Sequence, residues 1–553
     1  MERQPASRDC DVLLLGFEEW ENLGLRSIAA LLLQHGVKAK VQTLHASKEE
    51  ILAAIGRENP EIVGFSLIFQ RMLFDFADLI AFLRQAGIRA HFTMGGHFPS
   101  IEAQATLESI PGLNSVVRGE GEYTLLELFH RLHQPDTWEQ IQGLAFRRSQ
   151  GGEIRINPPR TKIKDLDSLP YPIRGDRLPT LRGLGLCSIL ASRGCHYDCS
   201  FCSIHQFYDE SPGPRRRARS PANVAQEMEQ LFHERGMRLF IFEDDDLFMR
   251  GRVQRQWIDS LVQELKHRGI ADQILWRVSC RVDDVDPEPI SQMMEAGLMS
   301  VYIGIESGNE QGLKTYNKHY TVDDIHQAIA KLRGVGIPFE FGFMILNPYT
   351  TFATLREDIA FLKEIGRDGH AVVEFTKMAP YAGTPIARRL QREGRLAGTL
   401  AAPDYAYLDS RLDLFQLFLT AAFHFRNFED RGLAERLRFA KLDAAIVRKF
   451  FSDKYDAQAY NAAIQELIRR SNEVALEKMS MAASFMETRT EAQIMDQWLF
   501  MEHLVQEEKA EEAQLSAALD WLMACFWADV LPTETGVDVA GKRRSVRSSV
   551  DSL

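Results

Sequence analysis

Between about residue 11 and residue 135, short continuous apolar runs alternate with amphipathic stretches. Each apolar run is followed by a segment of helical periodicity, such as residues 23–34 and 48–57, in units of about 25 residues. Continuous apolar runs are typical of parallel strands buried on both faces, so this pattern predicts βα units in an open parallel sheet. The predicted strands are DVLLL, AKVQTL, EIVGFS and RAHFTM. The expected fold of this part is α/β and Rossmann-like, of the flavodoxin-like kind.

The same alternation returns between residues 186 and 395. Helical segments such as 221–233 and 322–332 separate six apolar runs, and Ser220 before Pro221 has the form of an N-cap followed by proline. Six such units predict a partial (β/α)6 barrel, in which functional groups gather at the carboxyl ends of the strands. The predicted strands are CSILAS, RLFIFE, ILWRVSC, MSVYIGIES, FEFGFMI and AVVEFTKM.

Two stretches lack this alternation. One is rich in glycine, proline and charge and predicts a linker, and the other, after about residue 400, contains only helical patterns, at 408–428, 433–451, 457–478 and 491–528. The polar C-terminal end is predicted to be disordered. The predicted organisation is an N-terminal sheet domain over 1–149, a linker over 150–185, a barrel over 186–395, a C-terminal α-helical domain over 396–535 and a disordered tail over 536–553.

The bulk composition narrows the class of function. The 553 residues are 45% hydrophobic and 26% charged, with a net charge of −12, and such an acidic chain repels the phosphates of nucleic acids. The basic run at 215–219 is too short to change this and is either a solvated loop or an anion contact. No run approaches the roughly 20 apolar residues of a membrane span, and the N-terminus lacks a signal-peptide core. We therefore expect a cytoplasmic protein without nucleic-acid partners.

Three of the seven cysteines lie within eight residues, at Cys195, Cys199 and Cys202, directly after a predicted strand and a turn. Three thiolates at this spacing can bind three irons of a [4Fe–4S] cluster and leave the fourth iron open to an external chelator. Zinc is the competing interpretation. However, no fourth Cys or His follows at zinc-finger spacing, and His196 is too close to its neighbour to be an unstrained ligand. The remaining cysteines are scattered, at Cys10, Cys187, Cys280 and Cys525.

This CxxxCxxC spacing, with Phe201 before the last cysteine, resembles the signature of the radical S-adenosylmethionine (SAM) superfamily. The resemblance implies that the amino and carboxylate groups of SAM chelate the open iron. It also implies that one electron from the cluster cleaves SAM into methionine and a 5′-deoxyadenosyl radical. No catalytic side chain is assigned beyond the cluster and the cofactors.

The resemblance also places SAM contacts at later strand ends. Four consecutive acids at 243–246 need partners or solvent, because their charges repel. In the resembling enzymes this strand end holds the SAM amino group, for which Glu243 and Asp244 are favoured and Asp245 is a further candidate. An exposed acidic loop is the alternative. At the following strand ends the expected contacts are Ser279, Arg281, whose guanidinium suits the SAM carboxylate, and Glu306 in a GIESG segment.

Glycines and polar residues recur at the carboxyl ends of the N-terminal strands. In an open α/β sheet this edge binds ligands, and glycine lets a backbone approach them closely. One such loop would only mark the end of a strand, whereas several on one edge favour a ligand cleft. The set resembles the cobalamin-binding domain that is fused to one large radical SAM class. The resemblance implies cobalamin contacts at Leu23, Gly24, Ser66, Gln70, Gly95, Gly96, His97, Gly119 and Glu120.

One departure from cobalamin domains of the methionine-synthase type concerns the cobalt ligand. Those domains carry DxHxxG, whose histidine binds cobalt, whereas the corresponding stretch here, at 19–24, has no histidine. The resemblance therefore implies that cobalt lacks a protein histidine ligand. His97 is expected at the corrin edge or a phosphate, and residues 67–70 are expected to face the lower side of the corrin.

Two classes of function remain. The first is an enzyme that methylates an unactivated carbon of a small-molecule or natural-product substrate, because a carbon radical can accept a methyl radical from methylcobalamin. Cyclisation or ring rearrangement stays open, and a reductant protein such as flavodoxin or ferredoxin is expected. A methylthiotransferase is disfavoured, because its N-terminal domain supplies three cysteines and only Cys10 occurs here. The second class is a non-catalytic cobalamin or iron–sulfur sensor with a helical output domain.

Overall fold

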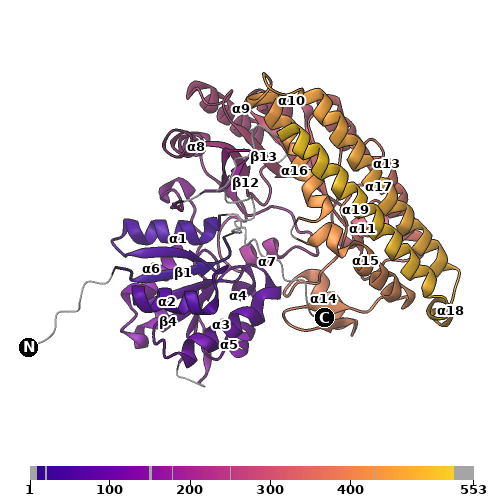
Figure 1. The fold of residues 1–553 in the computed structure, drawn as a ribbon. Helices are drawn as coiled ribbons and strands as arrows, with labels where there is room; N and C mark the ends of the chain where they lie inside the picture. The colour runs from indigo at the N-terminus through magenta and orange to yellow at the C-terminus, as the bar shows by residue number, and fades with distance from the viewer. Residues whose placement is uncertain are drawn as a thin grey trace, which may run out of the picture.

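The structure is a computed structural model that describes residues 9–18, 21–148, 152–176, 178–248, 251–429 and 431–527. Figure 1 shows a layered α/β unit at the N-terminal end, a curved sheet with outer helices, and a group of long helices toward the C-terminal end. The predicted disordered tail lies outside the described residues.

The N-terminal sheet has the strand order β2-β1-β3-β4-β5-β6-β7. Its first five strands are parallel, and β6 pairs antiparallel with both β5 and β7. The parallel order 2-1-3-4-5 is that of flavodoxin-like folds, which confirms the predicted fold class. The strands are β1 (Val12–Gly16), β2 (Ala39–Thr43), β3 (Ile62–Ser66), β4 (His91–Gly95), β5 (Ser115–Val117), β6 (Leu144–Arg147) and β7 (Ile154–Ile156).

Helices cover both faces of this sheet. Along the buried strand β1, Leu13 and Leu15 face one apolar core while Val12 and Leu14 face the other, because successive side chains of a strand point to opposite sides. This double burial explains why the strands are continuous apolar runs. One face carries α1 (Leu23–Gln34) and α6 (Glu122–His130), and the other carries α2 (Lys48–Glu58), α3 (Leu73–Gln85) and α5 (Ala103–Ser109). The short helix α4 (His97–Ile101) follows β4.

The stretch predicted as a linker contains short elements and one buried anchor. Besides β7, it holds a 3-10 turn at Leu166–Ser168 and the strand β8 (Thr180–Leu181). The Arg174 guanidinium, 6% exposed, lies between two carboxylates at 2.7 Å each, from Glu21 of the N-terminal unit and Glu227 of the barrel. This arginine therefore ties the linker to both neighbouring parts.

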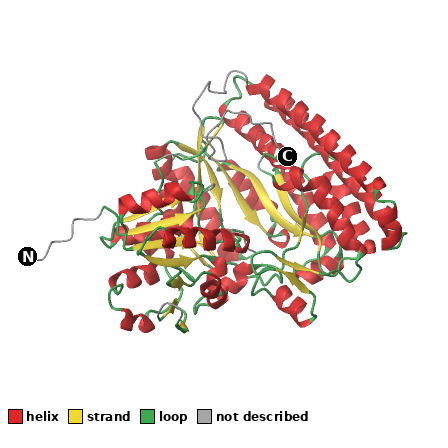
Figure 2. Cartoon of the chain, turned by 60° about the horizontal axis from the view of Figure 1, so that its bottom comes forward, coloured by secondary structure: helices red, strands yellow, loops and turns green. Residues whose placement is uncertain are grey.

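The second sheet has the order β16-β15-β14-β13-β12-β9-β8. Six of these strands, from β9 to β16, pair in parallel, and β8 is an antiparallel edge strand. Figure 2 shows the curl of this sheet, and the six parallel strands confirm the predicted partial (β/α)6 barrel. The parallel strands are β9 (Leu184–Ile189), β12 (Met237–Phe242), β13 (Leu275–Cys280), β14 (Leu298–Glu306), β15 (Phe339–Leu346) and β16 (Thr376–Lys377). The helices between them are α7 (Ser203–Asp209), α8 (Pro221–Arg235), α9 (Arg252–His267), α10 (Pro287–Glu295), α11 (Glu310–Tyr316), α12 (Val322–Val335) and α13 (Phe352–Gly366).

The sixth strand is much shorter than the predicted AVVEFTKM run. The first half of the predicted run is buried, but its backbone bonds to side chains and not to another strand. The backbone N–H of Val373 donates to Asn472 at 2.8 Å, and the carbonyl of Val373 accepts from Arg426 at 2.9 Å. These partners belong to C-terminal helices. Side chains of the helical domain therefore take the place of the hydrogen bonds that a neighbouring strand would make. The sequence pattern could not indicate this substitution.

The C-terminal part is helical apart from a small hairpin of β17 (Leu396–Gly398) and β18 (Pro403–Tyr405), which follows α14 (Pro385–Arg392). Two predicted boundaries differ from the structure: α17 continues to Glu487, and the last predicted helix is divided in two. No described helix is long and apolar enough to cross a membrane. The long helices are α15 (Arg411–Phe428), α16 (Leu433–Phe450), α17 (Ala457–Glu487), α18 (Glu491–Asp496) and α19 (Leu499–Trp527).

Candidate active site

The three clustered cysteines lie in a loop at the carboxyl end of the half-barrel. The loop begins after the short strand β10 (Ser192–Arg193), and α7 begins directly after Cys202. Gly194 has a φ of +87°, and a Cβ there would lie 1.9 Å from the carbonyl oxygen of Arg215. Only glycine fits this turn, which directs the chain from the strand into the cysteine loop.

The cysteine side chains fit an iron–sulfur cluster. Burial raises the pKa of Cys195 to about 12 and that of Cys202 to about 11, so both thiols are neutral in the protein alone. Bound iron would hold them as thiolates. Among the described residues, no group of three or more His, Cys, Asp or Glu side chains is arranged to hold a single metal ion.

Arg281 contacts the cysteine loop. Its guanidinium stacks on the Tyr197 ring at 3.6 Å, and its Nη1 lies 3.4 Å from the Cys199 sulfur. Its Nε pairs with Asp283 at 3.0 Å. The contact of Arg281 with the SAM carboxylate stays a prediction. Tyr197, two residues after the first cysteine, is a positioning residue that sequence analysis missed.

The four acids after β12 alternate in direction. Asp244 is 4% exposed and accepts hydrogen bonds from the backbone N–H of Ala191 and the hydroxyl of Ser192, at 3.1 and 2.5 Å. Its carboxylate thus bonds within the turn before the cysteine loop, and its contact with SAM stays a prediction. Glu243 and Asp245, by contrast, retain solvent contact although protein surrounds them, as expected of groups that line a cavity.

Asp245 is the acid nearest to the start of the cysteine loop. It accepts a hydrogen bond from the backbone N–H of Gly194 at 3.0 Å, and its deep position raises its pKa to about 6. The carboxylate of Glu243 accepts from Ser188 at 3.3 Å, and burial raises its pKa, an effect that nearby Arg277 opposes. Glu243 and Asp245, at alternate positions of the run, are the exposed members of the four acids.

Further strand ends contribute to the same region. Glu306 ends β14 with a φ of +68°, a strained conformation for a non-glycine residue, and lies 3.5 Å from the Lys318 ammonium. Phe201, between the cysteines, packs edge-on against Tyr316 with ring centroids 5.3 Å apart. Ser279 lines a cavity inside the barrel together with Glu243.

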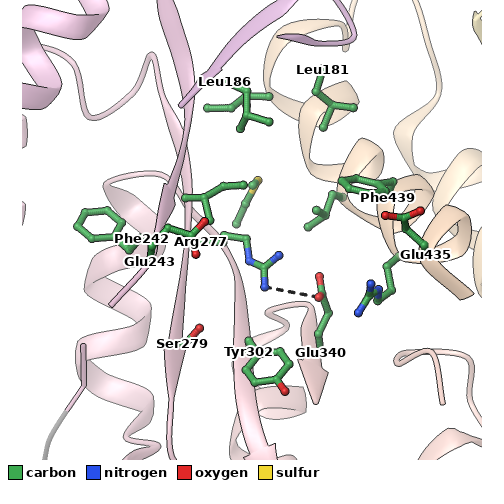
Figure 3. A pocket seen from close by; sticks show the side chains of 15 residues that line it. Leu181, Leu186, Phe242, Glu243, Arg277, Ser279, Tyr302, Glu340, Glu435 and Phe439 are labelled. Carbon is green, nitrogen blue, oxygen red and sulfur yellow. Dashed lines mark ion pairs between the residues drawn. The ribbon is translucent and has the colours of Figure 1, made fainter. Parts of the chain in front are cut away.

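That cavity has a volume of about 280 Å³ and lies between the inner face of the half-barrel and α16 (Figure 3). Its lower end contains Glu243 and Ser279, at the carboxyl ends of β12 and β13. The amino-terminal end of the barrel is closed by an apolar layer in which α16 meets the first residues of the strands. This layer consists of Leu181, Leu186, Leu239, Leu275, Met299, Leu442 and Ile446.

The loops predicted to bind cobalamin lie together at the carboxyl edge of the N-terminal sheet. The Asn22 side chain caps α1, directly before Leu23 and Gly24, and its amide lies 3.5 Å from the Ser66 hydroxyl. After Ser66 the apolar side chains of Ile68 and Phe69 are 36% and 53% exposed. Exposed apolar side chains beside a strand end suit the face of a large, flat ligand such as a corrin.

Three other predicted cobalamin contacts are engaged within the protein. The Gln70 side chain accepts from the backbone N–H of Ala382 at 2.9 Å and donates to the carbonyl of Leu400. His97 packs on Phe207 of α7, with ring centroids 4.6 Å apart, and burial lowers its pKa to about 4. Both residues connect the N-terminal unit to other parts of the chain, so neither is directed at a ligand in this structure.

The third engaged residue is Glu120 in the RGEGE loop. Its carboxylate lies 2.7 Å from Arg217, and its neighbour Glu122 lies 2.7 Å from Arg193, just before the cysteine loop. The Glu120 carboxylate is 8% exposed, and its contact with cobalamin stays a prediction. The preceding Gly119 has a φ of +70° and sits against Ser211. The RGEGE loop thus joins the two sheets.

Gly95 and Gly96 differ in the space around their Cα atoms. Gly96 has a φ of +111°, and a Cβ there would lie 2.3 Å from the carbonyl oxygen of Leu67. The glycine is needed for the fold itself. A Cβ on Gly95 would meet only the carbonyl oxygen of Val117, at 3.4 Å, so this glycine borders open space at the sheet edge.

Comparison with known proteins agrees with this arrangement. Residues 15–129 match the B12-binding domain family, and residues 189–362 match the radical SAM superfamily. An uncharacterized methyltransferase of Pyrococcus horikoshii is 29% identical over 341 residues, which cover 61% of this chain and 71% of that protein. An anaerobic magnesium-protoporphyrin IX monomethyl ester cyclase of Cereibacter sphaeroides is 27% identical over 63% of this chain, but the match covers only 56% of the cyclase.

A solved structure shows the same fold over most of the chain. It is the cobalamin-dependent SAM radical enzyme OxsB with aqua-cobalamin and SAM bound, with a TM-score of 0.66 and 16% identity over 94% of this chain and 80% of that one. The chain therefore belongs to the cobalamin-dependent radical SAM enzymes, with a B12-binding domain before a radical SAM barrel. Its cofactors are a [4Fe–4S] cluster, SAM and cobalamin.

Sequence analysis missed the residues that join or close the site. Arg193 and Arg217 are paired with the RGEGE loop, and Arg277 and Arg438 reach the barrel cavity from β13 and α16. Arg193 had a usable signal, because it directly precedes the glycine turn of the cysteine motif. Arg217 had one too, because it belongs to the basic run at 215–219, for which a carboxylate contact is one of the two interpretations. Arg277 and Arg438 are ordinary charges in amphipathic patterns, and only folding brings them to the site.

Proposed function

We propose that the protein methylates an unactivated carbon of a small-molecule substrate, with cobalamin as the methyl carrier. The observation that carries the proposal is the pairing of Arg193 with Glu122 at 2.7 Å. Arg193 lies two residues before Cys195, and Glu122 follows the last parallel strand of the N-terminal sheet. The pair therefore joins the carboxyl ends of the two sheets, so that ligands held by both would face each other.

Particular residues are proposed to hold each cofactor. Cys195, Cys199 and Cys202 would bind the cluster, and Glu243 and Asp245 would accept charge-assisted hydrogen bonds from the SAM amino group. When bound, SAM and the cluster supply a 5′-deoxyadenosyl radical, and cobalamin supplies the methyl group. The remaining proposed contacts are Phe201, Ser279 and Glu306 for SAM, and Leu23, Gly24, Ser66 and Gly95 for cobalamin, with Ile68 and Phe69 against the corrin.

The protein's own groups orient and shield the reaction. Arg281 holds the cysteine loop through its contacts with Tyr197 and Cys199. Arg193 and Arg217, buried against the RGEGE loop, fix that loop relative to the N-terminal sheet. Buried charge pairs of this kind lose several kcal/mol when one partner is removed, so they resist a change in domain spacing. A fixed spacing favours a substrate held between two cofactors.

Cyclisation is the second candidate. The cyclase of Cereibacter sphaeroides is nearly as similar as the methyltransferase, at 27% against 29% identity. In that case the substrate radical would close a ring and no methyl group would enter the product. The two functions share every cofactor residue proposed above, so only product analysis separates them.

The decisive experiment uses the full chain, reconstituted anaerobically with iron, sulfide and hydroxocobalamin. The protein is incubated with SAM carrying a trideuterated methyl group, a flavodoxin reductant and candidate substrates, and products are analysed by mass spectrometry. Methylation predicts a product that carries the intact trideuteromethyl group. An unlabelled, ring-closed product would favour cyclisation, and no 5′-deoxyadenosine at all would contradict both. The proposal includes a cytoplasmic location, where such an electron donor is present.

A further inference from the structure

The cavity inside the half-barrel is formed partly by the C-terminal helical domain. Its wall combines the inner face of six strands, β8, β9, β12, β13, β14 and β15, with one side of α16 (Figure 3). One part of the wall is apolar, and the other carries charged groups, as is common in pockets that bind small organic molecules. The apolar residues are Leu181, Leu186, Leu239, Ile241, Phe242, Met299, Phe439 and Leu442, and the polar ones are Glu243, Arg277, Ser279, Tyr302, Glu340, Glu435 and Arg438.

Each of the two guanidinium groups in the wall already has a carboxylate. Arg277 lies 3.6 Å from Glu340, the ion pair drawn in Figure 3. Arg438 lies 2.8 Å from Glu374, which is just behind the wall. Both arginines are thus largely neutralised, and an anionic ligand would have to compete with a carboxylate for either of them.

Two carboxylates of the wall, Glu243 and Glu435, are then left without an arginine partner among these pairs. Glu243 lies at the carboxyl end of β12, where the proposed function has the SAM amino group. Glu435 lies on α16, on the opposite side of the cavity in Figure 3, and its Oε2 accepts a hydrogen bond from the backbone N–H of Arg431 at 2.9 Å. SAM would neutralise only the first of these two acids.

The remaining negative charge affects the pKa values of two neighbouring groups, Glu374 and Tyr302. Burial raises the pKa of Glu374, and the nearby carboxylates of Glu340 and Glu435 raise it further against the effects of Arg438 and Arg426. The pKa of Tyr302 is raised by burial and by the carboxylates of Glu306, Glu374 and Glu340, so its hydroxyl stays protonated as a donor. A ligand that fills this space removes water from the carboxylates, and desolvated charge requires a compensating charge.

We infer that the cavity binds the cationic end of an amphipathic amine, and that Glu435 of the helical domain selects it. This inference rests on the proposed function only in identifying that amine as the substrate. The ammonium group would pair with Glu435, and the carbon skeleton would lie against the apolar wall near Phe439 and Met299. The C-terminal domain would then determine which substrate the barrel accepts.

The test compares three probes of equal chain length: n-hexylamine, n-hexanol and hexanoate. Their binding to the full, reconstituted chain is measured by equilibrium dialysis with SAM present and no reductant, so that nothing turns over. Hexylamine should bind at least about tenfold more tightly than the other two, the usual effect of one charged hydrogen bond in a desolvated site. Equal or tighter binding of hexanoate or hexanol would overturn the inference.

Two substitutions with opposite effects sharpen the test. Glu435→Gln should abolish the preference for hexylamine, whereas Arg438→Gln, which leaves one more carboxylate in excess, should increase it. Glu473→Gln is the matched control, because Glu473 is 63% exposed on α17 and pairs with Arg469. An unchanged preference in Glu435→Gln, or weaker hexylamine binding in a folded Arg438→Gln variant, would contradict the inference. Cluster content and thermal melting verify folding.

Failure of the proposed function gives a different pattern. If the wild-type chain cleaves SAM and binds cobalamin but prefers hexanoate, the cationic pocket is wrong and the proposed function stands. If the chain binds hexylamine through Glu435 but never binds cobalamin, the methyl-carrier function is wrong and the pocket stands.

Discussion

Arg193, two residues before the first cluster cysteine, donates a hydrogen bond to the carboxylate of Glu122 at 2.7 Å. The side chains are 16% and 4% exposed, and Glu120 lies 3.5 Å from the same guanidinium. A loop of the B12-binding domain is therefore bonded directly to the chain that enters the cysteine loop. This contact explains how two separate sheets can hold their ligands at a fixed distance.

The first prediction concerns this bridge. Glu122→Gln should loosen the contact, because it removes one charge from a buried pair at a cost of about 3 kcal/mol. Hydrogen exchange should increase in the peptides that contain residues 118–122 and 192–202, and less methylated product should form per 5′-deoxyadenosine released. Glu139→Gln is the control, because its ion pairs with Arg148 and Arg155 are exposed. Unchanged exchange at the bridge would show that other contacts hold the domains.

The second prediction concerns the cluster. Replacing Cys195, Cys199 and Cys202 together by alanine should abolish the broad iron–sulfur absorption and all SAM cleavage, because thiolates are the ligands of such clusters. Iron and sulfide analysis of the reconstituted protein measures the loss. Single replacements of Cys10 or Cys525 should leave the cluster intact. Retention of about four irons and SAM cleavage in the triple variant would contradict the assignment.

The third prediction separates the acids after β12. Glu243→Gln and Asp245→Asn should each weaken SAM binding about 10- to 100-fold, as expected when a charged hydrogen bond is lost from a desolvated site. Asp244→Asn should instead lower cluster content, because Asp244 holds the turn before the cysteine loop. Equilibrium dialysis with SAM measures the first effect and iron analysis the second. Glu288→Gln, on the exposed side of α10, is the control.

The fourth prediction is a pH dependence of SAM binding. The pKa of Asp245 is raised from its ordinary value to about 6, so the carboxyl group is increasingly protonated as the pH falls through 6. A protonated acid loses the ionised oxygen that would accept a charge-assisted hydrogen bond from the SAM amino group. SAM affinity should therefore be level above pH 7 and fall toward pH 5, by up to about tenfold per unit. Asp245→Asn should bind SAM more weakly and without this slope, and an identical slope in that variant would exclude Asp245.

The fifth prediction concerns cobalamin. Gly95→Leu should keep the protein folded but impair cobalamin binding, because the added side chain enters the open edge of the sheet. Gly96→Ala should lower the melting temperature even without cobalamin, because its Cβ would collide with the backbone of Leu67. His97→Ala should leave the spectrum of bound cobalamin unchanged, since the His97 ring packs on Phe207. Nitrogen coupling from labelled histidine to cobalt in electron paramagnetic resonance would contradict that expectation.

The sequence by itself determined the fold class and the cluster motif. Parallel strands buried on both faces must be continuous apolar runs, so both parallel sheets could be recognised from local pattern alone. Cys195, Cys199 and Cys202 needed no tertiary information either, because adjacent ligands of one cluster are set by their spacing along the chain. The carboxyl ends of the strands, where Ser66 and Glu243 lie, followed from topology once the strands were known.

The tertiary structure alone decided the direction and partners of the charged side chains. Of two adjacent acids at one strand end, Asp244 turns into the protein and Glu243 toward the cavity, because successive residues of an extended chain point to opposite sides. Glu120 and Arg281 had plausible ligand roles in sequence, but distant residues, Arg217 and Tyr197, already engage them. The cavity wall at Glu435 required folding as well, since electrostatic contacts depend on distance in space and leave no periodic signal along the chain.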